Sequence, residues 1–100
     1  GVMPVPETYG LTQHFLKSII TRLEKQLEDK KVEGTGGNGA VCVVISGKLQ
    51  VLGVKINPRS VRNVAQLEEL VADAVDDALQ KGSELLKSEA RKLLGDVPLP

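Results

Sequence analysis

A short apolar run in the middle of the chain, residues 40–45 (AVCVVI), constrains the fold more than any other feature. β-Branched residues dominate this run, and such residues favour strands. Successive side chains of a strand point to opposite faces, here Val41, Val43 and Ile45 to one and Cys42 and Val44 to the other. A strand that is apolar on both faces needs a cover on both sides. The run therefore predicts the central strand of a covered sheet.

Four glycines directly precede this run: Gly34, Gly36, Gly37 and Gly39. Glycine-rich loops that hold phosphate are followed by a helix, whose first N–H groups bind the anion. Here an apolar strand follows instead, and no Gly-Lys-Ser or Gly-Lys-Thr sequence is present. The cluster therefore predicts a connection between two strands, in which glycine supplies positive φ angles.

The flanking sequence predicts two more strands and two helices. We expect strands near residues 31–35 and 49–56, with Gly47-Lys48 as a two-residue hairpin turn and Asn57-Pro58 as the end of the last strand. A helix is expected from Thr12, after an extended lead-in over residues 1–10. A second helix is expected from Asn63, where Gln66 completes a capping box, to Gly95, with a possible bend at Gly82.

The length of the second helix has consequences for the shape of the molecule. About 30 residues extend for about 45 Å in an α-helix, whereas a compact domain of 100 residues has a radius of gyration of about 13 Å. The far half should therefore project beyond the sheet, and the first helix can pair with it antiparallel. Two helices that form such a projection cannot cover both faces of the sheet, so we expect a second copy of the chain to cover the remaining face. We predict a homodimer with an interface formed by Val41, Cys42, Val43, Val44, Ile45, Leu49 and Val51.

Composition excludes several classes of protein. Thirteen basic and thirteen acidic side chains cancel, and Cys42 is the only cysteine, which precludes an intrachain disulfide. No apolar run is long enough to span a membrane, and the N-terminus lacks a signal-peptide pattern.

Asp73, Asp76 and Asp77 lack His or Cys companions, so a solvated helix face is favoured over a metal site. His14 and Cys42 have no evident catalytic partners, so we expect neither an enzyme nor a cofactor.

Charge is segregated along the chain. Residues 12–31 carry five basic and three acidic side chains, and residues 78–94 carry four basic and two acidic ones, so each segment has a net charge of +2. Residues 63–77 carry five acids and no base. Solvated helix faces and phosphate contacts account for this pattern about equally well.

The ordered set of segments resembles the YbaB/EbfC nucleoid-associated proteins. The matching stretches are Val32-Glu33-Gly34 with the glycines after it, residues 41–47, residues 54–58 (VKINP) and the helix over residues 67–81 (LEELVADAVDDALQK). The likeness covers residues 11–100, which we interpret as one domain. It implies an α+β protomer of the order α-β-β-β-α with a three-stranded antiparallel sheet, a tweezer-like homodimer, and binding of double-stranded DNA with little sequence preference.

Two functions follow as hypotheses. The first is DNA binding by the basic helical segments, in the cytoplasm and nucleoid or, after removal of a targeting peptide, in an organelle. Its predicted contacts are Lys17, Arg22, Lys25, Lys81, Lys87, Arg91 and Lys92. The alternative is a protein-binding assembly or chaperone-like factor without DNA affinity, suggested by the apolar stripe of Phe15, Ile19 and Leu23.

Overall fold

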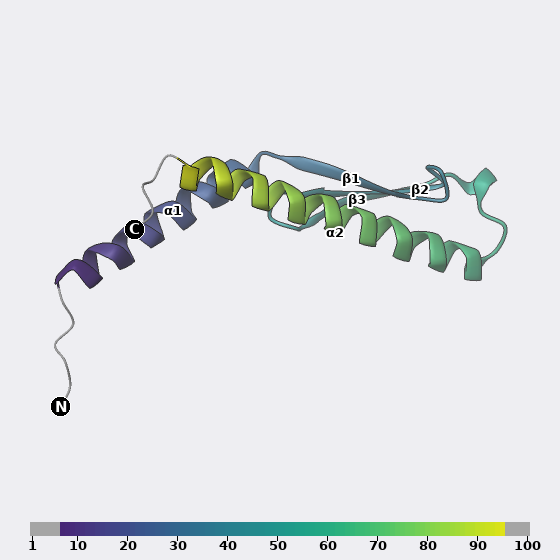
Figure 1. Cartoon of the computed structure of the whole chain (residues 1–100). Coiled ribbons are helices and arrows are strands. Elements are labelled where there is room, and N and C mark those ends of the chain that lie inside the picture. Colours follow the sequence, from purple (N-terminus) through teal and green to yellow (C-terminus); the bar gives the residue numbers. More distant parts are fainter. Residues whose placement is uncertain (1–6, 96–100) are drawn as a thin grey trace, which may run out of the picture.

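The computed structural model describes residues 7–95, with side chains from residue 13 onward. Two helices flank three strands in the order α1 (Glu7–Glu28), β1 (Lys31–Gly36), β2 (Val41–Ser46), β3 (Val51–Ile56) and α2 (Val64–Gly95), with a short 3-10 helix, η1 (Pro58–Ser60), before α2 (Figure 1). This confirms the predicted α-β-β-β-α order. The predicted helix start at Thr12 is wrong, because α1 already begins at Glu7; residues 1–6 of the expected lead-in lie outside the described residues.

The sheet is antiparallel, with β2 between β1 and β3. Gly37 and Gly39 of the glycine cluster lie in the turn between β1 and β2, as predicted, whereas Gly34 and Gly36 belong to β1. Gly37, Asn38 and Gly39 have φ angles of 60°, 55° and 92°, and the N–H of Ala40 donates to the carbonyl of Gly37 at 3.2 Å. Three successive positive φ angles explain why this turn is made of Gly-Asn-Gly.

The second hairpin differs from the predicted two-residue turn at Gly47-Lys48. Ser46 N–H donates to the Gln50 carbonyl and Leu49 N–H to the Ser46 carbonyl, both at 2.8 Å, so the loop comprises Gly47, Lys48 and Leu49. Leu49, not Gly47, has the positive φ, at 63°. A type I turn followed by a left-handed residue is a common three-residue hairpin loop. The strand β3 consequently begins at Val51 rather than at Leu49.

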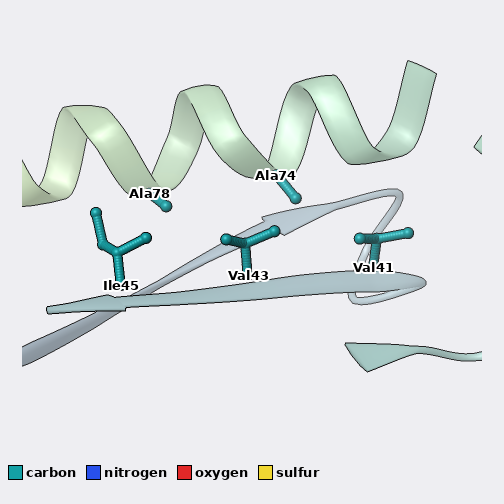
Figure 2. Packing of buried hydrophobic residues seen from close by; sticks show 5 residues of the cluster. All are labelled: Val41, Val43, Ile45, Ala74 and Ala78. Atoms are coloured by element: carbon teal, nitrogen blue, oxygen red, sulfur yellow. The ribbon is translucent and has the colours of Figure 1, made fainter. Parts of the chain in front are cut away.

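The core lies between β2 and α2. Val41 and Val43 are fully buried and Ile45 nearly so, beneath the fully buried Ala74 and Ala78 of α2 (Figure 2). Small residues bring the two layers close together on β1 as well. A Cβ atom at Gly34 would collide with the backbone of Ala74 and Ala78. The helix backbone therefore rests directly on the strand backbone, which only glycine permits.

The helix α2 is capped and unbroken. Asn63 Oδ1 accepts the N–H of Gln66 at 2.8 Å, which confirms the predicted cap at Asn63, whereas Gln66 Oε1 accepts the N–H of Arg62 at 2.6 Å rather than the N–H of Asn63 that a capping box requires. The helix continues without interruption through Gly82, where a bend seemed possible. Gly82 is buried, and a Cβ there would lie 2.6 Å from Leu49 Cδ2 and 3.1 Å from Ile45 Cδ1. Its role is to make room for these side chains.

The molecule is elongated, with principal extents of 66 × 32 × 19 Å and a radius of gyration of 19.7 Å. The C-terminal part of α2 passes the sheet and packs against α1, which runs in the opposite direction (Figure 1). This confirms the predicted projection of paired helices. We call α1 together with residues 78–94 of α2 the arm.

The helix α2 covers β1 and β2, and it alters the predicted dimer interface. Val41, Val43 and Ile45 are buried by α2 within the single chain, so the expectation that a second copy covers these three side chains is wrong. Ala74 and Ala78 let α2 lie close enough to the sheet to bury these three side chains of β2. Cys42 and Val44, on the opposite face, are half-buried.

The edge strand β3 remains apolar and uncovered. Val54 and Ile56 pair with Val43 and Val41, and directly paired residues point to the same sheet face. They therefore extend the apolar surface beyond the edge of α2. Four side chains of β3 are about half exposed or more: Val51 (62%), Leu52 (52%), Val54 (49%) and Ile56 (44%).

Candidate nucleic-acid interface

The helix α1 separates its cations from its apolar side chains. Leu23 is half-buried and Leu27 is buried, whereas Lys17, Arg22 and Lys25 are all exposed. With 3.6 residues per turn, Lys25 falls on the helix face opposite Leu23 and Leu27, and Arg22 and Lys17 fall on the two flanks of that face. The exposed side of α1 thus carries three cations from the middle of the helix to its last turn, together with the exposed acids Glu28 and Asp29 at its C-terminal end.

The end of α2 carries a second pair of exposed cations. Lys87 and Arg91 are four residues apart and therefore neighbours on one face, and this face is turned away from the buried Gly82 and Glu89. Within residues 13–95, no ion pair involves Lys87, Arg91 or the three cations of α1. The fold therefore leaves these five predicted contacts available to an anionic ligand.

Lys81, by contrast, connects α2 to the sheet. Its Nζ lies 3.1 Å from Asp77 Oδ2 and donates to the Glu33 carbonyl at 3.0 Å. The same Asp77 oxygen accepts the N–H of Thr35 at 2.9 Å. The hydrogen bond from Thr35, and then that from Lys81, lowers the pKa of Asp77 below its ordinary value. Lys81 thus serves the attachment of α2 to β1.

Lys92 belongs to a second ion-pair cluster, centred on Glu89. This carboxylate is only 3% exposed, and it pairs with Lys30, which follows α1, and with Lys92 at 3.3 Å. The hydrogen bond from Lys30 is the main cause of a lowered pKa for Glu89, and Lys92 adds to it. The sequence analysis missed this cluster. Its signal was an acidic residue seven positions after Gly82, on the buried side of the helix.

The acidic side chains of α2 lie mostly at its other end. Glu68, Glu69, Asp73 and Asp76 are all exposed. Among the described residues no group of three or more His, Cys, Asp or Glu side chains is arranged to hold a metal ion. His14 is exposed, and Cys42 is half-buried on the open sheet face. No helix of the described chain is long and apolar enough to cross a membrane.

Two shallow grooves occur on the described surface. One, of about 300 Å³, lies between the end of α1, the β2–β3 loop and α2; the other, of about 270 Å³, lies around η1. The first is lined by Ile20, Leu23, Glu24, Leu27, Gly47, Lys48, Leu49 and Leu86. Neither of these two grooves is lined by a Ser, Cys or His side chain.

Comparisons with known proteins identify a family and several relatives. The model of the YbaB/EbfC DNA-binding family matches residues 13–97. A nucleoid-associated protein of Dictyoglomus turgidum is 39% identical over 87 residues, covering 85% of this chain and 84% of its own length. Another, from Moorella thermoacetica, is 32% identical over 83 residues, covering 81% of this chain and 80% of its own.

A solved structure shares the fold. The crystal structure of an uncharacterized protein from Helicobacter pylori superimposes with a TM-score of 0.70 at 19% identity, and the match covers 83% of this chain and 99% of that one.

Proposed function

This chain belongs to the YbaB/EbfC DNA-binding family. We propose that it is a nucleoid-associated protein that binds duplex DNA through the exposed cations on the two helices of its arm. One observation carries this proposal. Five exposed cations on the arm have no ion pair among residues 13–95, while the exposed acids of α2 gather mainly at the opposite end: Lys17, Arg22, Lys25, Lys87 and Arg91 against Glu68, Glu69, Asp73 and Asp76.

Phosphates are the expected ligands of these cations. Lysine and arginine on a solvated helix face can neutralise the DNA backbone without reading bases, and binding then has little sequence preference. Lys81 and Lys92 are each held by a carboxylate, so we assign them a smaller share of the binding than the sequence alone suggested.

The second part of the proposal is a homodimer formed around β3. The exposed Val51, Leu52, Val54 and Ile56 give this edge strand an apolar surface that α2 does not reach. A second copy seated there would cover it and would also protect the open strand edge. Leu49 and Val51 remain in the proposed interface, and two arms per dimer would double the number of phosphate contacts.

One observation favours the alternative of a protein partner. Phe15, Leu16 and Ile20 of α1 are 45%, 50% and 53% exposed. An uncovered apolar helix face is a common docking site for another protein. In this reading the arm binds a polypeptide and has no affinity for DNA.

A DNA titration at two salt concentrations separates the two functions. Wild-type protein should bind duplexes of different sequence with similar affinity, and binding should weaken steeply with salt. Replacing Lys87 and Arg91 together with Ala should weaken binding to all duplexes, with helix content checked by circular dichroism. Arg59 and Arg62, which lie near η1 away from the arm, provide the control pair. Unchanged affinity in the arm variant would remove the arm from the mechanism and favour a protein partner.

A further inference from the structure

The attachment of α1 to the rest of the molecule is concentrated at its C-terminal end. Leu27 is buried, and the carbonyl of Lys30 accepts the N–H of Gly47 at 2.8 Å. The Lys30 side chain reaches Glu89 of α2. In contrast, residues 13–18 are all exposed. The direction of α1 is therefore set by a few contacts around Lys30.

Among these contacts, Glu89 is the unusual one. It is the one charged side chain among the described residues that is buried. Burying a carboxylate costs free energy unless it is paired and hydrogen-bonded, and an apolar side chain would fill the same place without that cost. The pair Lys30–Glu89 joins residues 59 positions apart. Lys92 lies on the same helix as Glu89, so only Lys30 connects two elements through this carboxylate.

A small rotation at this point moves the basic face of α1 considerably. Lys17 is 13 residues before Lys30, which corresponds to about 20 Å along a helix. A rotation of about 10° at the base then displaces Lys17 by about 3 Å, enough to break a phosphate contact of ordinary hydrogen-bond length.

We propose that Glu89 is a positioning residue, which holds Lys30 and thereby fixes the basic face of α1 relative to Lys87 and Arg91 on α2. This inference rests on the proposed DNA binding, because the function of the fixed geometry is to match cations on two helices to one phosphate backbone. Glu89 itself does not touch DNA.

The first test measures the arm without DNA. Spin labels are placed at Ser18→Cys on α1 and Ser88→Cys on α2, both exposed, in a Cys42→Ser background. Labelled chains are diluted with unlabelled ones so that distances within one chain dominate. Lys30→Gln should broaden the distance distribution, whereas Lys92→Gln, which removes the partner within α2, should leave it as in the unsubstituted label pair. Equal distributions in both variants would overturn the proposal.

The second test uses the sign of the change in DNA affinity. Glu89→Gln removes a negative charge from the arm, so electrostatics alone predicts tighter binding. Glu84→Gln makes the same charge change at an exposed position of α2. Positioning by Glu89 predicts binding several-fold weaker for Glu89→Gln and equal or tighter binding for Glu84→Gln. Tighter binding in both variants would contradict the proposal.

A matched lysine pair keeps the test decisive if Glu89→Gln does not fold. Lys30→Gln and Lys92→Gln each remove one cation and one partner of Glu89. The proposal predicts a loss of affinity at least several-fold larger for Lys30→Gln, and equal losses would overturn it. If wild-type protein shows no DNA binding, the proposed function fails, while the label distances still decide whether Glu89 fixes the arm.

Discussion

The substitution Gly34→Ala tests the close packing of α2 on β1. An added Cβ would collide with backbone atoms of Ala74 and Ala78, and backbone cannot move aside as the end of a flexible side chain can. Forcing extra volume into a packed core costs about 1–3 kcal/mol, and we expect the upper end here. Reduced freedom of the unfolded chain returns about 0.4–1 kcal/mol. The net loss should therefore be about 2 kcal/mol.

Gly53→Ala is the matched control in the same sheet. A Cβ at Gly53 meets no atom within 4 Å, and its φ lies outside the left-handed region. Only the effect on the unfolded chain remains, so this variant should gain about 0.4–1 kcal/mol. The same chemical change thus has opposite signs at two positions of one sheet.

Thermal and urea unfolding followed by circular dichroism measure both variants at one protein concentration. For a domain of this size, 1 kcal/mol shifts the Tm by about 4–8 °C, so Gly34→Ala should melt about 8–16 °C below wild type. If Gly34→Ala is as stable as Gly53→Ala, the helix does not rest on the strand backbone and the packing argument is refuted.

Three further predictions concern charge and assembly. The pKa values of Glu89 and Asp77 are lowered in the fold, so their charged forms stabilise the folded state at pH values above the ordinary pKa values of 4.5 and 3.8. The free energy of unfolding should therefore fall as the pH drops below these ordinary values and through the lowered ones. In this pH range the free energy of unfolding of Glu89→Gln and Asp77→Asn should depend less on pH than that of wild type. Lys25→Ala should reduce the slope of log affinity against log salt by about two per dimer, whereas Lys81→Ala should change it less. Val54→Lys should convert the proposed dimer to monomers in analytical ultracentrifugation, and a dimer that persists in this variant would exclude the β3 face as its interface.

The order of the elements was predictable because local patterns determine it. The glycine cluster, the apolar run over residues 40–45 and the cap at Asn63 each act within a few residues. The errors arose where tertiary contacts decide. A positive φ at Leu49 and the burial of Val41, Val43 and Ile45 by α2 depend on how distant segments pack, which periodicity does not report.

The candidate site was predictable only in part, for a related reason. Sequence identified the basic segments, and the helical spacing of Lys81–Asp77 and Lys92–Glu89, four and three positions apart, could have indicated that these two lysines are paired. The hydrogen bond from Thr35 to Asp77 and the ion pair of Lys30 with Glu89 join residues 42 and 59 positions apart. Contacts at such separations exist only after folding, so the anchoring of these two carboxylates to other elements required the structure.

The two helices of the arm are held in different ways, and this difference bears on how the arm would act. Along β1, Gly34 and Gly36 would each place a Cβ against the backbone of α2, so the packing fixes α2 over the sheet through many atoms. The helix α1 is held at its C-terminal half by the packing of Leu23 and Leu27, and by the ion pair of Lys30, which follows it, with Glu89 of α2. Lys87 and Arg91 thus lie on the helix that the sheet fixes, whereas the cations of α1 follow the geometry at Lys30. If the arm binds a curved or irregular DNA backbone, we therefore expect α1 to change its direction more than α2, and the ion pair of Glu89 with Lys30 to limit that change.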